Sequence, residues 1–307
     1  MPRTLGFLGP EGTYSESACI LFDPTSQLKP YSTITAVGEA VASGEIEEGM
    51  VPIENSLEGQ VTFTLDLLIA QPNLHIKGEA DVPIEHFLLA KPGTNPDEIQ
   101  VIYSHPQALG QCRTYLEKNF PNAQQMASLS TVLCIKDSFE SPYPAAAITP
   151  GRAAELYDVD ILDRGIQDVA NNVTRFALLG LTDHAPTGND KTSMAFTLEK
   201  DSPGLLHRVL GEFAKRDINL LKIESRPTKQ LLGEYIFLLD CVGHREESPM
   251  KEALAALSDP ISMLRILGSY PRWISPVYNL QRQQFAIKNQ LSPNVTSKNP
   301  NPTHYTS

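Results

Sequence analysis

Several features that would place the protein in a membrane, on a nucleic acid or in the secretory pathway are missing from the sequence. No apolar run approaches the roughly 18 residues that a membrane-spanning helix needs. The first eight residues carry one basic side chain and lead into a Gly-Pro pair, a pattern unlike a signal peptide. Basic charge is scarce, because 25 Lys and Arg stand against 36 Asp and Glu, a formal net charge of -11. Since nucleic acids and anionic membranes are polyanions, we expect a cytoplasmic protein with neither as a partner.

Cysteine is also sparse, and its spacing fits neither a metal site nor a disulfide framework. The sequence has no Cys-x-x-Cys pair, and its four cysteines are Cys19, Cys112, Cys134 and Cys241. We expect reduced and mostly buried thiols. The sequence has no Ser-His-Asp ordering, no His-Glu-x-x-His pair, no Walker loop and no dinucleotide fingerprint. Nothing in the sequence therefore calls for a metal ion, a cofactor or a covalent nucleophile.

The residues that are present predict two folded domains and a tail. A length of 307 residues suggests about two domains at roughly 150 residues each. Residues 1–183 alternate between short apolar strands and helical stretches, which predicts an α/β domain with mainly parallel sheets. Residues 191–275 follow the order βαββαβ of a ferredoxin-like unit, after a linker rich in turn residues. Residues 281–307 are rich in Gln, Asn, Ser and Pro, and we expect a disordered tail there.

Polar side chains gather in four segments where a predicted strand meets a helix or another strand. Ligands of open α/β sheets bind at the strand ends, so these segments are candidate site segments. The first is Gly9–Ser15, where backbone N–H groups and the hydroxyls of Thr13 and Ser15 would face an anion. The second, Ile53–Gly59, offers Asn55 and Ser56 as donors.

The other two segments offer amide, imidazole and guanidinium groups. Tyr103–Cys112 places Gln107 and Gln111 four residues apart, on one helix face, with Ser104 or His105 at the cap. Asn171–Phe176 precedes a strand and offers the Thr174 hydroxyl beside the rigid fork of Arg175. Taken alone, each of the four segments is explained almost as well by ordinary turns and helix caps.

Taken together and in this order, the four segments resemble prephenate dehydratase. The resemblance spans residues 4–275 and rests on GPEGTYS at Gly9–Ser15, VPIENSLEG at Val51–Gly59, SHPQALGQC at Ser104–Cys112 and NVTRF at Asn172–Phe176. The second unit resembles an ACT regulatory domain, with ESRP at Glu224–Pro227. The resemblance implies a two-lobed α/β catalytic domain, similar to periplasmic binding proteins, with its site in the cleft between the lobes. It also implies the monofunctional form of the enzyme.

The family reaction is a carbon–oxygen lyase reaction that converts prephenate to phenylpyruvate with loss of carbon dioxide and water. By resemblance, Thr174 donates a hydrogen bond to the leaving hydroxyl and Arg175 holds a carboxylate. The resemblance assigns catalysis to Thr174, Arg175, Asn55 and Ser104. It assigns substrate binding to Thr13, Ser56, Gln107, Gln111, Asn172 and Phe176, with Phe176 packing beneath the site. Prephenate is a dianion and the chain is acidic, so we expect local positive potential from Arg175 and from helix starts.

The ACT resemblance implies pairing into a homodimer or homotetramer and binding of the effector L-phenylalanine. The residues it assigns to the effector site are Pro203, Gly204, Leu205, Leu206, Asn219, Glu224, Ser225, Arg226 and Pro227. Leu205 and His207 depart from the family pattern, which leaves the identity and sign of the effector open. Two other functions stay open: an arogenate dehydratase, whose substrate carries an ammonium in place of the keto group, and an amino-acid-binding sensor without chemistry.

Overall fold

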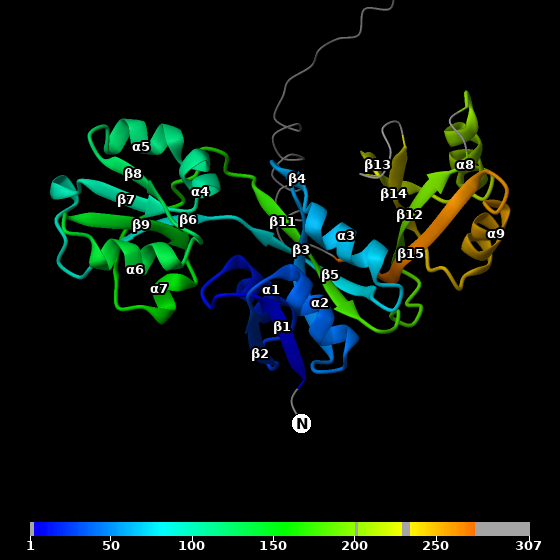
Figure 1. Cartoon of the computed structure of the whole chain (residues 1–307), viewed down its shortest axis with the longest axis horizontal. Coiled ribbons are helices and arrows are strands. Elements are labelled where there is room, and N and C mark those ends of the chain that lie inside the picture. The colour runs from blue at the N-terminus through cyan, green and yellow to red at the C-terminus, as the bar shows by residue number, and fades with distance from the viewer. Residues whose placement is uncertain (1–2, 200–201, 229–233, 274–307) are drawn as a thin grey trace, which may run out of the picture. The chain divides into compact units, whose positions relative to one another are not determined.

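The computed structural model describes residues 3–199, 202–228 and 234–273, in three sheets with helices packed on them (Figure 1). The first two sheets belong to two lobes that the chain enters in turn, and the third belongs to a C-terminal unit. The tail predicted at residues 281–307 lies outside the described residues.

The first lobe is built on a mixed sheet. Along the sheet the strands are β2 (Gln27–Tyr31), β1 (Thr4–Leu8), β3 (Glu48–Asn55), β11 (Val173–Gly180) and β5 (His75–Pro83), with β4 (Gly59–Gln60) paired to β3. Its helices are α1 (Tyr14–Phe22), α2 (Ile34–Ala42) and α3 (Thr62–Ala70). β1 runs parallel to β2 and β3, whereas β11 runs antiparallel to β3 and β5. The expected parallel sheet is therefore mixed, because β11 returns to this lobe from the second one.

The second lobe is a five-stranded mixed sheet covered on both faces. Its strands, in spatial order, are β10 (Asp160–Arg164), β6 (His86–Ala90), β9 (Ala145–Pro150), β7 (Val101–Ser104) and β8 (Gln124–Ala127). Its helices are α4 (Pro106–Gln111), α5 (Arg113–Asn119), α6 (Leu133–Glu140), α7 (Ala153–Leu156) and the 3-10 turn η1 (Pro96–Glu98). α4 and α5 pack with Leu88 on one face, and α6 and α7 pack with Leu89 on the other (Figure 1).

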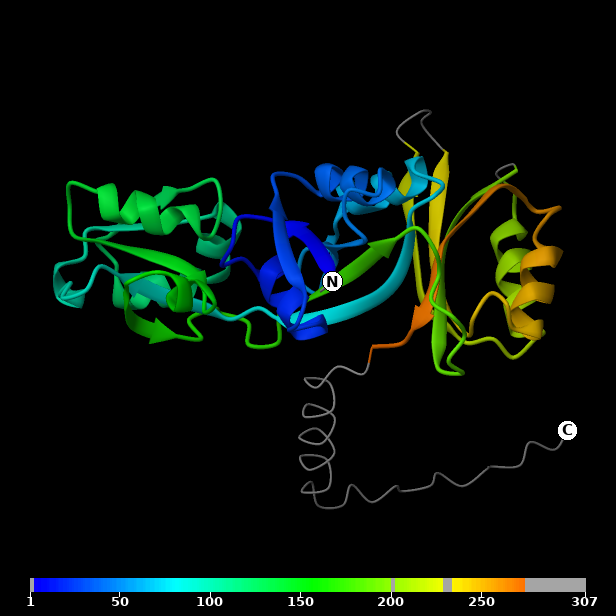
Figure 2. The ribbon, with the colours of Figure 1, turned by 90° about the horizontal axis from the view of Figure 1, so that it is seen from below.

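The C-terminal unit is an antiparallel sheet with two helices on one face (Figure 2). The strand order is β13 (Leu220–Pro227), β14 (Tyr235–Val242), β12 (Asp190–Leu198) and β15 (Ile261–Pro271), and the helices are α8 (Leu205–Ala214) and α9 (Ser248–Ala256). Met194 and Phe196 of β12 pack with the helices, while Ala195 between them packs into the core of the first lobe. The predicted βαββαβ order is confirmed.

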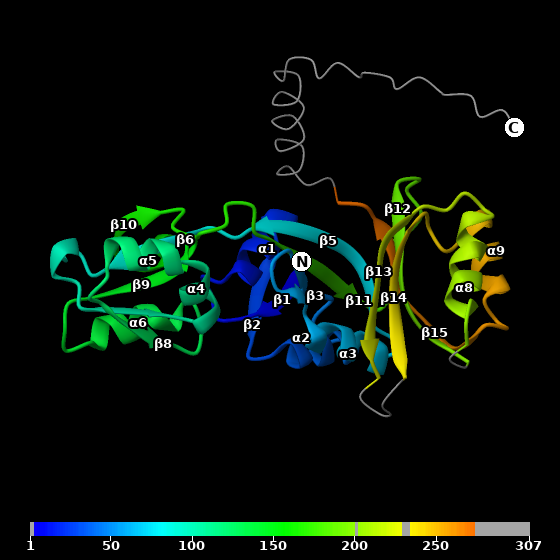
Figure 3. The same ribbon diagram turned by 90° about the horizontal axis from the view of Figure 1, so that it is seen from above.

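Two crossover segments join the lobes and position the site. The chain passes from β5 to β6 through Ile84, and it returns to β11 through Asn172. The two crossovers lie together, because the Ile84 amide donates to the Asn172 carbonyl over 2.9 Å. β5 and β11 then run side by side through the first lobe (Figure 3). Residues on either crossover therefore sit between the two lobes.

Two smaller predictions have clear outcomes. All four cysteines are free and buried, as the sparse spacing predicted. α4 and α5 are separate helices, because Cys112 between them leaves the helical region with φ -112° and ψ 17°. Within the described ranges, no helix is both long and apolar enough to cross a bilayer.

Candidate active site

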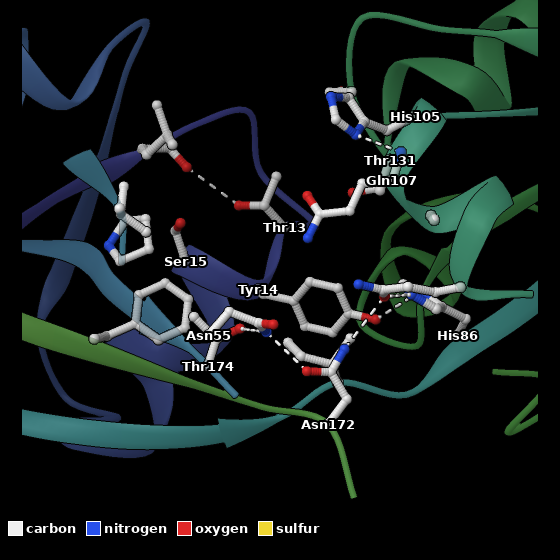
Figure 4. A pocket seen from close by; sticks show the side chains of 18 of the residues that line it. Thr13, Tyr14, Ser15, Asn55, His86, His105, Gln107, Thr131, Asn172 and Thr174 are labelled. Carbon is white, nitrogen blue, oxygen red and sulfur yellow. Dashed lines mark hydrogen bonds between the residues drawn. The ribbon is translucent and has the colours of Figure 1, made fainter. Parts of the chain in front are cut away.

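A cavity of about 430 Å³ lies between the two lobes, next to the crossovers (Figure 4). Its lining comes from the end of β1, the starts of α1 and α4, the segment before α6 and the strands β3 and β11. Its polar lining side chains are Thr13, Tyr14, Ser15, Ser32, Asn55, His86, His105, Gln107, Gln111, Ser130, Thr131, Asn172 and Thr174. No Asp, Glu, Lys or Arg is among the described residues that line it. The cavity therefore offers hydrogen bonds rather than formal charge.

Thr174 and Asn55 form a cross-strand pair that faces the cavity. β11 and β3 place these two residues opposite each other in the antiparallel register. Both side chains are largely buried, and the Asn55 Nδ2 donates to the Thr174 Oγ1 over 2.8 Å (Figure 4). Two segments 119 residues apart in sequence thus supply one hydrogen-bonded unit.

The hydrogen bonds of Asn55 determine how the Thr174 hydroxyl points. The Asn55 Oδ1 accepts from the amides of Leu57 and Glu58, at 2.9 and 3.0 Å, so the orientation of the carboxamide is defined. Its Nδ2 donates to Asn172 Oδ1 and Thr174 Oγ1, both at 2.8 Å. Because the Thr174 oxygen accepts from Asn55, its own hydrogen must point elsewhere. The cavity is the open space beside it.

A chain of hydrogen bonds connects this pair to the second lobe. Asn172 Nδ2 donates to Gln111 Oε1 over 3.2 Å, and that oxygen lies 2.9 Å from His86 Nε2. With Gln111 accepting, His86 carries its hydrogen on Nε2 and presents Nδ1 as an acceptor. The one hydrogen of the Tyr14 hydroxyl, on α1 of the first lobe, is shared between that Nδ1 at 3.0 Å and the Glu85 carbonyl at 2.7 Å. Side chains of both lobes are therefore tied together around the cavity.

Burial keeps His86 and Tyr14, the two ionisable groups in this series of hydrogen bonds, uncharged. Loss of solvation lowers the pKa of His86, and the hydrogen bond to Gln111 offsets only part of that effect. Loss of solvation likewise raises the pKa of Tyr14 well above its usual value. Both groups are neutral at pH 7, which is the state that their hydrogen bonds require.

Further donors project into the cavity from segments that begin helices. His105 caps α4, accepting from the Gln107 amide at Nδ1 over 3.3 Å, so its Nε2–H is left for a ligand. Thr13 caps α1, and its hydroxyl donates to the Pro10 carbonyl over 2.9 Å. Ser15 and Thr131 line the cavity, and their hydroxyls make no hydrogen bond to other described residues. The helix starts add partial positive charge on this side of the cavity.

Comparisons with known proteins agree with the four segments. A sequence profile described as prephenate dehydratase matches residues 5–184, and an ACT domain profile matches residues 195–259. The chain belongs to the prephenate dehydratase family. The family resemblance and the predicted fold class are thereby confirmed.

Individual relatives show how far the similarity to the family extends. A bifunctional chorismate mutase/prephenate dehydratase of Aquifex aeolicus is 39% identical over 269 residues, covering 87% of this chain and 73% of that protein. A prephenate dehydratase of Lactococcus lactis subsp. cremoris is 38% identical over 271 residues, covering 87% of this chain and 96% of that protein. The crystal structure of a prephenate dehydratase from Arthrobacter aurescens in complex with L-Phe matches with a TM-score of 0.80 at 36% identity, covering 94% of this chain and 99% of that chain.

Arg175 is not among the described residues that line the prephenate dehydratase cavity, and its predicted contact with a substrate carboxylate stays a prediction. Successive residues of β11 point to opposite faces, so Thr174 faces the cavity and Arg175 faces the ACT domain. The guanidinium lies 2.9 Å from Asp240 of β14 and 3.1 Å from Glu54 of β3. Burial alone would raise the pKa of Asp240, but the charges of Arg175 and Lys191 outweigh it and lower that pKa to about 2. Both terminal nitrogens of the guanidinium are thus paired without a ligand, while its buried Nε has no hydrogen-bond partner among the described residues.

Ser104 and Ser56 also lie outside the cavity lining. Ser104 is fully buried, and its hydroxyl donates to the Ile148 carbonyl over 2.6 Å. Ser56 accepts from the Val173 amide over 3.0 Å and so fastens the crossover to β3. Both serines make hydrogen bonds to the backbone, and the predicted parts of Ser104 in catalysis and of Ser56 in substrate binding stay predictions. The predicted residues that do line the cavity are Asn55, Thr174, Thr13, Gln107, Gln111, Asn172 and Phe176, the last packed in the core beneath it.

Sequence reasoning missed several cavity residues of this family member, and three of them show why. Tyr14 lies inside the first motif, but its role depends on a partner 72 residues away, at His86. His86 is the first residue of an apolar strand, and a histidine in such a position is not distinguished by sequence from an ordinary buried residue. Thr131 precedes α6, and a Ser-Thr pair before a helix was the available signal. Among the described residues, no group of three or more His, Cys, Asp or Glu is arranged to hold a metal ion.

The residues predicted for the effector site lie on α8 and β13 of the ACT domain and just before them. Gly204 precedes α8 with φ 82°, a conformation that glycine favours, and Leu205 is buried in the domain. On β13, Glu224 lies 3.4 Å from Lys222, and Arg226 pairs with Asp66 of α3 over 2.6 Å. The remaining predicted residues are on the same two segments or near them: Pro203, Leu206, Asn219, Ser225 and Pro227. Their part in effector binding stays a prediction.

Proposed function

We propose that the protein is a prephenate dehydratase that converts prephenate to phenylpyruvate, carbon dioxide and water. The observation that carries the proposal is the Thr174–Asn55 pair at a cavity rich in neutral donors. The bond between the ring and its carboxylate breaks, and the electron pair forms a ring double bond. The bond from the opposite ring carbon to its hydroxyl oxygen breaks, that oxygen takes up a proton, and water leaves. One proton is consumed from solvent, and the ring becomes aromatic.

Thr174 is the group that assists departure of the hydroxyl. Its oxygen accepts from Asn55, which directs its hydrogen toward the cavity and makes it a more acidic donor. A threonine hydroxyl is too weak an acid to transfer its proton outright, so it acts by a hydrogen bond that strengthens as charge develops on the leaving oxygen. Assistance of this kind typically contributes about 10²- to 10⁴-fold in rate.

The two carboxylates of prephenate are held by neutral donors. Ser15, Gln107, Thr131 and the Nε2–H of His105 face the cavity, and the starts of α1 and α6 add partial positive charge. Because the donors belong to both lobes, the substrate would draw the lobes together and exclude water from the ring. No redox step is required, since the reaction is driven by aromatisation.

The lining favours prephenate over arogenate. Arogenate carries an ammonium where prephenate has a keto oxygen, and an ammonium would be matched by a carboxylate. No Asp or Glu is among the described lining residues, whereas donors suited to a keto oxygen are several. Turnover of the two substrates by the purified chain tests this point. We expect kcat/KM for prephenate to exceed that for arogenate at least about tenfold, about 1.4 kcal/mol. A preference for arogenate would overturn the choice of substrate, and no turnover of either would favour a binding sensor.

We further propose that the ACT domain binds L-phenylalanine as an inhibitor and pairs two chains into a dimer in the cytoplasm. β13 is an edge strand of its sheet, paired to β14 alone among the described strands. Leu221 and Ile223 on that strand are 40% and 47% exposed, which is unusual for apolar residues at a sheet edge. A second β13 would cover them. Light scattering is expected to give at least twice the mass of the 33.8 kDa chain, and a monomer at micromolar concentration would contradict the pairing.

A further inference from the structure

The cavity-facing pair has a charged counterpart on the other face of the same two strands. Asn55 is opposite Thr174 in the β3–β11 register, and the neighbouring pair is Glu54 opposite Arg175. Since side chains alternate along a strand, the first pair faces the cavity and the second faces the ACT domain. Any displacement of Glu54 and Arg175 is therefore passed through one peptide unit on each strand to the group that holds the Thr174 hydroxyl.

Lys222 of β13 connects this counterpart to the predicted effector segment. Its Nζ lies 2.7 Å from Glu54 and 3.4 Å from Glu224, the first residue of the ESRP motif. The ion pairs thus form a continuous series from Glu224 through Lys222 and Glu54 to Arg175. Among the described residues, Lys222 is the cation paired with both carboxylates.

The surroundings of this series leave it room to change. Lys222, Glu54 and Glu224 are all partly exposed, and a cavity of about 20 Å³ lined by Arg175, Lys222 and Asp240 lies beside them. A space of that size holds about one water molecule. Partly exposed ion pairs contribute little to stability, so Lys222 can exchange partners without unfolding either domain.

We propose that Lys222 is the residue that couples the ACT domain to the active site. The proposal rests on the proposed regulation by L-phenylalanine. An amino acid bound beside Glu224 brings an ammonium group that competes with Lys222 for that carboxylate. Lys222 then pairs with Glu54 alone, the Glu54–Arg175 pair shifts, and the Asn55–Thr174 pair shifts with it. Lys222 does not line the active-site cavity and would not contact the substrate there, so it acts as a positioning residue.

The test compares Lys222→Met with Lys215→Met, which removes an exposed lysine paired with Glu212 on α8 of the same domain. Two quantities are measured on the full-length protein: the Kd for L-phenylalanine by calorimetry, and kcat/KM for prephenate with and without saturating L-phenylalanine. Typical allosteric coupling changes affinity about 5- to 150-fold. In Lys222→Met we expect basal kcat/KM within about twofold and Kd within about threefold of wild type, with the phenylalanine effect on kcat/KM reduced to less than about twofold. Lys215→Met should keep the full effect.

A second variant tests the coupling role of Lys222 without relying on the Lys222→Met substitution alone. Glu54→Gln breaks the same series at its other end, and the double variant Glu54→Gln/Lys222→Met should lose no more coupling than either single variant. Strong inhibition that survives in Lys222→Met overturns the coupling role while the proposed regulation stands. A Kd raised more than about tenfold overturns it too, because Lys222 would then belong to the effector site. A wild-type enzyme indifferent to phenylalanine overturns the proposed regulation and this inference with it.

Discussion

Thr174 and Arg175 are neighbours in the sequence and belong to different parts of the molecule. One accepts from Asn55 beside the cavity, and the other is paired with Glu54 and Asp240 against the ACT domain. The resemblance assigned both residues to one site, because a sequence motif records the order of residues and not the direction in which their side chains point. Strand geometry separates them, since adjacent side chains of a strand lie on opposite faces of its sheet.

The role of Asn55 as a donor is open to a nearly isosteric change. In Asn55→Asp, the atom facing Thr174 becomes an acceptor, so the Thr174 hydrogen turns toward the new carboxylate and away from the substrate. The added negative charge also opposes a dianionic substrate. We expect kcat to fall about 10²- to 10³-fold, measured by phenylpyruvate formation. Thermal unfolding should show a folded protein of lower stability, because the new carboxylate cannot donate to the Asn172 Oδ1 as the amide did. A kcat within fivefold of wild type would show that Thr174 does not depend on this orientation.

Asp81 on β5 carries a pH-dependent cost to stability. Burial and the neighbouring charge of Glu79 raise its pKa to about 6. The folded protein therefore binds this proton more tightly than the unfolded chain does. The resulting contribution to the free energy of unfolding is complete below about pH 4 and is lost as the pH rises through 6. Asp81→Asn, which mimics the protonated form, should raise the unfolding free energy at pH 7.5 by on the order of 1 kcal/mol. The gain should shrink toward zero at pH 4.5, and an equal gain at both pH values would contradict the assignment.

At the scale of elements, β15 of the ACT domain packs closely on β5 of the catalytic domain. A Cβ built on Gly268 of β15 would lie 2.2 Å from the Ile76 carbonyl oxygen of β5, so glycine is required by the contact itself. Gly268→Ala should therefore lower the unfolding free energy by about 1–3 kcal/mol, measured by urea denaturation.

Gly211 in the middle of α8 provides the matched control. A Cβ there meets no atom within 4 Å, and alanine is the better helix former. Gly211→Ala should raise the unfolding free energy by about 0.5–1 kcal/mol, the opposite sign to Gly268→Ala. If both substitutions destabilise the protein equally, the close packing of β15 on β5 is not what Gly268 serves.

The elements that could be predicted from sequence were those with clear apolar runs, and the rest depended on tertiary context. β1, α3, α8 and the βαββαβ order show apolar patterns that fit a single structure. β2 is an exposed edge strand containing Lys29 and Pro30, and its pattern does not differ from that of a loop. The sequence also does not tell which residues of β11 point to which face of the sheet, because both faces are covered and side chains on both are buried. This assignment decides which of Thr174 and Arg175 faces the cavity.

At the scale of the whole molecule, an acidic chain binds a dianion without any charged lining residue that the structure describes. Because Arg175 is not among the described lining residues, we expect the local positive potential to come from helix starts and neutral donors. The two possibilities differ in how salt changes the affinity for prephenate. Salt screens the attraction between the substrate and a cationic site, which weakens binding. Salt also screens the repulsion between the dianion and a chain of net charge -11, which strengthens binding.

We therefore expect the KM for prephenate to stay constant or to fall by up to about twofold when ionic strength rises from about 0.01 to 0.15 M. Steady-state kinetics at constant pH with added potassium chloride measure this directly. A KM that rises severalfold over this range would mean that a cation holds the substrate carboxylates, and Arg175 would again be a candidate.

We propose that the Thr174 hydroxyl, directed by Asn55, assists departure of the ring hydroxyl. Its most direct test is single-turnover conversion of prephenate to phenylpyruvate by wild type, Thr174→Val and Thr174→Ser under saturating enzyme. Valine preserves shape and removes the donor, whereas serine keeps it. We predict a rate loss of about 10²- to 10⁴-fold for Thr174→Val and of less than about tenfold for Thr174→Ser. Turnover by Thr174→Val within about fivefold of wild type would contradict it.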